Sequence, residues 1–221
     1  MRKSRLAALM LIISMMMLVA ACGAQNSSGS SEAEETKQTY DPCPIAAEHG
    51  EQDNYKVSEG TFEFSKGGMT FRVPDCFGEL AGNSGDANRN ARISRFYAAT
   101  GMDMGMLEFT GIENAKTIPD EDFDMYQKLF LSTSLNTMRN SEGVSDFTEV
   151  YNKVFLLKNG QKAGVSFYTL NMTGAAIEAW SVLINDPIDN TTVLVSLFQT
   201  ADAEYDYAKC FEAMIMDGII G

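Results

Sequence analysis

The sequence predicts an α+β fold in which a mainly antiparallel sheet of about six to eight strands is flanked by two helices. Two turn motifs, Gly67-Gly68 and Asn159-Gly160, each separate segments with the alternating pattern of β-strands. Two other segments, which begin at Pro119 and Asp202, carry apolar residues at helical spacing. Strands therefore stand before and after a long helix, and a second helix closes the chain.

The first hairpin has a register that follows from its turn. With Gly67-Gly68 as a two-residue connection, the apolar residues of both strands share one face and the charged residues share the other. The expected pairs are Phe62–Val73, Glu63–Arg72 and Phe64–Phe71. Pro74 ends the second strand because proline cannot donate a ladder hydrogen bond. Residues 78–91, which are rich in Gly, Asn and Asp, are expected to form a loop.

Apolar periodicity and turn residues define the remaining elements. The expected strands are Arg92–Ala99, Met104–Thr110, Glu149–Leu157, Gln161–Met172, Ala176–Ile184 and Thr191–Gln199. The first helix is expected to run from Pro119 to about Arg139, and the last from Asp202 to about Met216. The later strands carry apolar residues on both faces, which predicts a sheet that is covered on both sides.

The order of these elements over residues 60–221 resembles the PsbP/Mog1-like fold, which also includes DcrB-type bacterial lipoproteins. The residues that carry the resemblance are Thr61–Phe64, Met69–Pro74, and Tyr207, Phe211 and Ile215 of the closing helix. Cys76-Phe77-Gly78 departs in part from the aromatic-glycine turn that many such proteins carry after the first hairpin. The resemblance implies non-catalytic binding or assembly work, with partners that differ between members. An NTF2-like cone is the alternative fold, although it would place helices before the first strand.

Residues 1–21 have the organisation of a bacterial secretory signal. A basic start is followed by the apolar run Leu6–Leu18, and small residues then precede Cys22. This ending resembles the lipobox of bacterial lipoproteins, which implies diacylglyceryl transfer to the Cys22 sulfur and cleavage before it. The apolar run is shorter than the roughly 20 residues that a membrane-spanning helix needs. The resemblance therefore implies a lipid-anchored protein on the extracytoplasmic face of a cell membrane.

Residues 22–54 are expected to form a lipidated flexible tether, and residues 55–221 a single globular domain. The tether segment begins with Gly, Asn and Ser and continues with several Glu, so it has little apolar surface with which to offset chain entropy.

The chain is strongly acidic, with 30 acidic and 17 basic residues and a formal net charge of −13. Such a charge disfavours binding to nucleic acid, where affinity depends on neutralising phosphates. It also repels an anionic membrane surface, so attachment falls to the lipid. The expected partners are membrane lipid, through acylated Cys22, and an unknown envelope protein or ligand, with no nucleic acid.

Three cysteines remain besides Cys22, namely Cys43, Cys76 and Cys210. Their wide spacing does not match a Cys-x-x-Cys redox or zinc motif. Because thiols tend to oxidise outside the cytoplasm, we expect a disulfide between Cys43 and Cys76 that joins the entering segment to the first hairpin. A Cys76–Cys210 bridge and the absence of any bridge are the alternatives.

Signals of catalysis are scarce in the sequence. The only histidine, His49, lies in the expected tether, and no zinc-ligand spacing or glycine-rich phosphate loop is present. We therefore expect no catalytic residues, no cofactor and no metal, and a non-catalytic binding or accessory domain. Two alternative functions remain. One is a solute or metal-binding lipoprotein, with Met102, Met104 and Met106 as soft ligands along one strand; the other is a carboxylate-based cell-wall hydrolase.

A candidate binding loop follows the first hairpin. Arg89 lies within residues 78–91 and Arg92 directly follows them. Long loops inside compact domains often carry function. A positive spot on an otherwise acidic body would attract an acidic partner or ligand.

Overall fold

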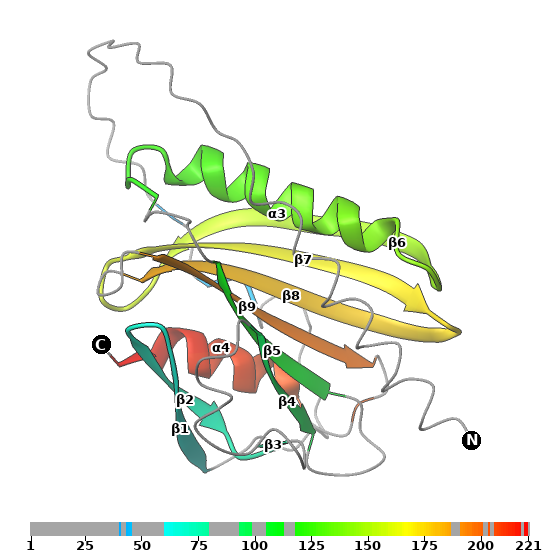
Figure 1. The fold of residues 1–221 in the computed structure, drawn as a ribbon, viewed down its shortest axis with the longest axis horizontal. Coiled ribbons are helices and arrows are strands. Elements are labelled where there is room, and N and C mark those ends of the chain that lie inside the picture. Colours follow the sequence, from blue (N-terminus) through cyan, green and yellow to red (C-terminus); the bar gives the residue numbers. More distant parts are fainter. Residues whose placement is uncertain are drawn as a thin grey trace.

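The structure is a computed structural model. It describes residues 40, 43–45, 60–79, 93–98, 105–112, 118–186, 191–200, 203, 206–217 and 219–220. Within these residues the chain forms a seven-stranded sheet, a three-stranded sheet and two helices, and all strand pairs are antiparallel (Figure 1). The predicted α+β fold, with its mainly antiparallel sheet and two flanking helices, is confirmed.

The three-stranded sheet has the order β1-β2-β10 and contains the first hairpin. Strands β1 (Thr61–Lys66) and β2 (Met69–Pro74) pair in the register expected from Gly67-Gly68. Strand β10 (Ile219–Ile220) follows the last helix and pairs with β2. The sequence did not predict β10, because two residues are too few to show an alternating pattern.

The seven-stranded sheet has the order β3-β4-β5-β9-β8-β7-β6. Its strands are β3 (Phe77–Glu79), β4 (Ile93–Ala98), β5 (Gly105–Ile112), β6 (Val144–Leu156), β7 (Lys162–Met172), β8 (Ala175–Asp186) and β9 (Thr191–Thr200). Consecutive strands from β6 to β9 pair with one another, and β9 then pairs with β5. The expected meander is therefore joined to the earlier strand pair through β9.

Four expected boundaries were wrong. The loop expected at residues 78–91 begins inside β3, where Gly78 pairs with Tyr97 and Glu79 with Phe96. Strand β6 begins at Val144 rather than Glu149, and its register with β7 shifts twice. Such bulges hide the alternation on which the strand prediction relied. The two helices begin later than expected, at Phe123 and Tyr207. In the case of the first helix, residues 120–122 form a turn before it.

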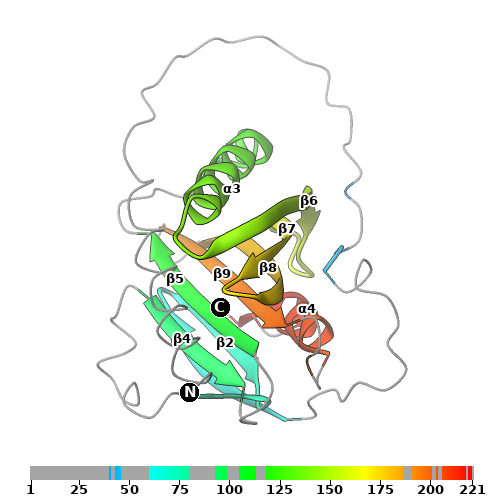
Figure 2. The same ribbon diagram turned by 90° about the vertical axis from the view of Figure 1, so that its right-hand side faces the viewer.

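The two helices lie on opposite faces of the seven-stranded sheet (Figures 1 and 2). Helix α3 (Phe123–Arg139) packs on β6, β7 and β8, and α4 (Tyr207–Asp217) contacts β9 and the first hairpin. Strand residues alternate between the two sides: Val195 belongs to the main core with α4, whereas Phe198 belongs to a second core with α3. The expectation of a sheet covered on both sides is confirmed.

Aromatic contacts join the two sheets in the main core. The ring centroid of Phe64 in β1 lies 4.9 Å from that of Phe96 in β4 and 4.9 Å from that of Phe109 in β5. Farther along the large sheet, Phe167 and Trp180 stack with centroids 4.6 Å apart. All of these side chains are buried, so the hairpin is held by packing against the larger sheet.

Helix α3 passes close to strand β7 at Gly164. A Cβ atom placed on Gly164 would lie 2.9 Å from Cβ of Gln127, a buried residue of α3. Real Cβ atoms do not tolerate contacts this short, so the helix can take this position only above a glycine.

We predict that Gly164→Ala lowers the free energy of unfolding by about 1–3 kcal/mol, because the added methyl group overpacks the contact with α3. Urea unfolding followed by fluorescence measures this change. A double-mutant cycle with Gln127→Gly provides the control, since removing the opposing Cβ should make the Gly164→Ala cost smaller. An equal cost in both backgrounds would show that α3 does not sit over Gly164.

Candidate functional site

A short segment that precedes the first strand contacts the folded domain. This segment, Tyr40 and Cys43–Ile45, is here named the clasp. The side chain of Ile45 is fully buried and belongs to the main core. The hydroxyl group of Tyr151, in β6, donates a hydrogen bond of 3.0 Å to the carbonyl oxygen of Pro44. The clasp therefore contributes to the main core beside strand β6.

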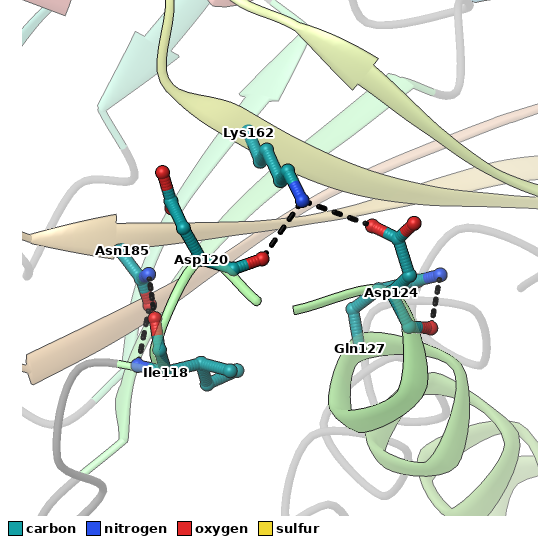
Figure 3. A network of polar contacts seen from close by, with 6 residues as sticks. All are labelled: Ile118, Asp120, Asp124, Gln127, Lys162 and Asn185. Atoms are coloured by element: carbon teal, nitrogen blue, oxygen red, sulfur yellow. Dashed lines mark hydrogen bonds and ion pairs between the residues drawn. The ribbon is translucent and has the colours of Figure 1, made fainter. Parts of the chain in front are cut away.

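The other end of the clasp lies beside the start of α3. The ammonium nitrogen of Lys162, at the start of β7, lies 5.2 Å from the ring centroid of Tyr40. Lys162 also donates a hydrogen bond of 2.8 Å to the carbonyl oxygen of Asp120, and its Nζ lies 3.6 Å from Oδ1 of Asp124 (Figure 3). Burial alone would lower the pKa of Lys162, but the hydrogen bond with Tyr40 and the charges of Asp124 and Asp120 raise it.

The segment that leads into α3 is fixed by an amide side chain. The Nδ2 atom of Asn185, in β8, donates a hydrogen bond of 2.8 Å to the carbonyl oxygen of Ile118. The backbone N–H of Ile118 donates one of 3.1 Å to Oδ1 of Asn185 (Figure 3). The backbone N–H and C=O groups of Ile118 are thus both satisfied by the side chain of Asn185. This contact holds the segment that leads into α3.

The clasp contacts groups on both faces of the seven-stranded sheet. Tyr40 meets Lys162, which is bonded to the residues at the start of α3, whereas Cys43 meets Glu212 of α4. Residues 22–54 were expected to form a flexible tether, and the sequence did not predict these contacts. An isolated Ile45 near two prolines has no periodic pattern that would mark it as part of a core.

The cysteine of the clasp has an unreactive thiol. Burial raises the pKa of the Cys43 thiol to about 12. A backbone hydrogen bond at Ile45 acts against this rise, whereas the nearby Glu212 carboxylate adds to it. A thiol with so high a pKa is a poor nucleophile. Cys43 is a free thiol in the structure, so the expected Cys43–Cys76 bridge is not formed there and stays a prediction for the oxidised protein.

A row of polar side chains crosses the α3 face of the large sheet. From β4 to β6 the row is Arg95, Glu108, Ser196, Ser181, Ser166 and Asn152, each paired in register with the next. The hydroxyl groups of Ser181 and Ser196 are 2.9 Å apart, and Nδ2 of Asn152 donates a hydrogen bond of 2.9 Å to Oγ of Ser166. The row separates the second core from the small cluster of Leu131, Leu183 and Leu194.

The row ends in a buried ion pair. The Nε atom of Arg95 donates a hydrogen bond of 2.8 Å to Oε2 of Glu108, whose side chain is only 2% exposed. Burial raises the pKa of Glu108, while the charge and hydrogen bond of Arg95 and the hydrogen bond of Thr110 act against that rise. The carboxylate is therefore occupied by Arg95 and Thr110, and the pair serves to fix the register of β4 on β5.

A shallow groove of about 280 Å³ lies beside β6, near the turn that joins β7 to β8. Its lining residues are Asp146, Thr169, Leu170, Asn171, Ala176, Ile177 and Glu178. Oε2 of Glu178 accepts a hydrogen bond of 2.9 Å from Nε2 of Gln199. Among the residues that the structure describes, no group of three or more His, Cys, Asp and Glu side chains is placed to hold a metal ion.

Several residues that the sequence singled out lie outside the described part of the chain. These are Cys22, the expected binding-loop residues Arg89 and Arg92, and Met102 and Met104. Lipidation and the binding loop therefore stay predictions. Met106 is described, and it is buried in the second core with Leu135 and Met138 of α3, where it fills space under the helix. Helices in the described ranges are too short or too polar to cross a membrane.

No protein-family model matches the sequence, and no curated protein was found to be similar to it. Among solved structures, a mutant of the protein Mog1 has a TM-score of 0.46 and 12% identity, and the match covers 73% of this chain and 95% of that one. The Ran-binding protein Mog1p of Saccharomyces cerevisiae has a TM-score of 0.44 and 12% identity, with coverage of 73% and 96%. A protein of unknown function from Pseudomonas aeruginosa has a TM-score of 0.35 and 12% identity, with coverage of 64% and 84%.

Two of these three structures are of Mog1. The likeness concerns the fold alone. The α+β architecture of this chain rests on its own strand order and register.

We predict that Arg95→Met lowers the free energy of unfolding at pH 7.5 by about 3–5 kcal/mol, because it leaves the buried carboxylate of Glu108 without its counter-charge. The pKa of Glu108 in the folded protein then lies further above its unfolded value. Protonation therefore favours the folded state, and the variant becomes less stable as pH rises from the unfolded pKa through the folded one. Urea unfolding should show a smaller deficit at pH 5 than at pH 7.5.

The double variant Arg95→Met/Glu108→Gln is the control for this prediction. It removes the uncompensated charge, so it should recover part of the loss at pH 7.5 and show little dependence on pH. A deficit in Arg95→Met that is the same at both pH values would contradict the assignment of a charged, buried Glu108.

Proposed function

We propose that the chain is a lipid-anchored protein on the extracytoplasmic face of a cell membrane, and that its domain performs non-catalytic binding or accessory work there. The lipobox-like ending at Cys22 carries the proposed anchor, and the clasp is compatible with it. A chain anchored at Cys22 would meet its folded domain at Tyr40 and Ile45, well before the first strand at Thr61. A pulling force on the proposed anchor would then act on the buried contacts of the clasp rather than on the end of β1.

The clasp also limits how far the domain stands from the membrane. Only residues 23–39 would separate an acylated Cys22 from Tyr40. A flexible chain of that length has a root-mean-square reach of about 23 Å. The proposed tether therefore holds the domain close to the surface that carries the lipid.

Non-catalytic work is supported by how the acids and bases are used. An active site presents an acid, base or nucleophile to a cavity where a substrate can reach it. Here Glu108 is bonded to Arg95, Lys162 to the start of α3, and Asp206 caps α4 through the backbone N–H of Lys209. Each of these groups is committed to holding the fold.

The charge of the chain supports a protein or ligand of the envelope as its partner. A net charge of −13 opposes contact with nucleic acid and with anionic lipid headgroups. Attachment through acyl chains does not depend on charge, so the proposed anchor is compatible with an acidic domain.

We predict that Cys22→Ser moves the protein from the membrane fraction to soluble or uncleaved precursor fractions and abolishes labelling by a palmitate analogue. Cell fractionation and metabolic labelling measure the two effects. Cys43→Ser is the matched control, because it removes a cysteine from the same chain but leaves the lipobox intact. Labelling that persists in Cys22→Ser, or that is lost in Cys43→Ser, would contradict the proposed anchor.

A further inference from the structure

The outer face of α3 carries two large apolar side chains in solvent. Met125 and Leu129 are each 62% exposed, and they are one helical turn apart. The buried residues Phe123, Gln127 and Leu131 face the sheet, so Met125 and Leu129 point away from it. This pair is here named the outer pair.

Few large apolar side chains are exposed in the described ranges. Within the described ranges, the large hydrophobic side chains that are exposed are the outer pair, Val150 and Leu156. The last two belong to β6, the edge strand against which α3 packs. Single exposed apolar residues are ordinary, but a pair spaced by one turn forms a ridge that a second helix can pack against.

Exposed carboxylates lie just before the outer pair, in the turn that leads into α3. They are Asp120, Glu121 and Asp122, of which Glu121 and Asp122 stand four and three residues before Met125. The exposed basic residues of α3 are Lys128 and Arg139, and the guanidinium of Arg139 lies 4.9 Å from the ring centroid of Phe147. The rim of this face is therefore negative where the chain enters α3, and Lys128 lies beside Leu129.

We propose that the outer face of α3 is a docking site for a basic amphipathic helix of a partner protein. This inference rests on the proposed binding function and names the class of its partner. Apolar side chains of the partner helix pack against the outer pair, and its lysines or arginines face the carboxylate rim. Methionine suits such a surface because its flexible side chain adapts to the shape of what binds.

Charge argues against two other occupants. A second copy of this chain would bring a net charge of −13 against the same rim, and like charges oppose such contact. An anionic lipid surface is repelled for the same reason. A cationic helix gains from the same field that excludes them.

The test measures binding of a fluorescein-labelled amphipathic peptide of leucine and lysine to the full chain in nanodiscs of zwitterionic lipid, with empty nanodiscs as the background. Fluorescence anisotropy gives the Kd. Met125→Ser/Leu129→Ser should raise the Kd by about tenfold or more. Val150→Ser/Leu156→Ser is the matched control, because it removes two exposed apolar side chains from β6, and it should change the Kd by less than about twofold.

Two further measurements test the charge of the site and the fold of the variants. A leucine–glutamate peptide of the same length should not bind, and Glu121→Lys/Asp122→Lys should weaken binding of the lysine peptide. The Tm of each variant should stay close to that of the parent chain, since the substituted side chains are exposed. Equal binding of both peptides, or an unchanged Kd in the outer-pair variant, would overturn the proposal.

The same variants separate this proposal from its alternatives. Sedimentation of the chain without peptide should show a monomer; a dimer that Met125→Ser/Leu129→Ser disrupts would assign the face to a second copy and overturn the proposal. The Cys22→Ser chain, measured in solution, should bind the lysine peptide as the parent does. If the parent chain does not bind the lysine peptide, but still moves out of the membrane fraction when Cys22 is replaced by Ser, the docking site is refuted and the proposed anchor is not.

Discussion

Burial of both faces of the seven-stranded sheet is the constraint on which the rest of the structure depends. The long strands place large apolar side chains on each side, such as Trp180 toward α4 and Tyr168 toward α3. Each face needs a covering layer, because leaving one of these side chains exposed would lose about 1.5–3 kcal/mol of hydrophobic stabilisation. Helix α3 covers one face, and α4 with the first hairpin covers the other. Ile45 of the clasp belongs to this second layer although it lies outside any helix or strand.

A sheet covered on both sides must also satisfy the polar groups that it buries. In the row from Arg95 to Asn152, side-chain hydrogen bonds between adjacent strands join Arg95 to Glu108, Ser181 to Ser196 and Asn152 to Ser166. These side chains are held by their structural partners, which is compatible with the proposed binding role. The proposed docking surface is the solvent side of α3, where exposed apolar and acidic residues lie near one another.

Local signals in the sequence predicted much of the fold, and long-range contacts account for what they missed. The register of the first hairpin follows from its glycine turn, and the two-sided strands follow from the pattern of Val, Leu and Phe. The clasp, β3 and β10 depend on partners far along the chain, so their short segments carry no periodicity of their own. Serines at the centre of β7, β8 and β9 were the available signal for the polar row, but its pairing with Glu108 required the strand order. The predicted sites at Cys22, Arg89 and Arg92 lie outside the described residues.

The claim that the clasp is part of the main core is tested most directly by hydrogen–deuterium exchange of the full chain with and without Ile45→Ala. Removal of a buried isoleucine side chain beside β6 should speed exchange of the backbone amides in Tyr151–Leu156 by about tenfold or more. Amides of α3, on the opposite face, should keep their protection. Unchanged exchange in β6, or an equal loss of protection in α3, would contradict the account.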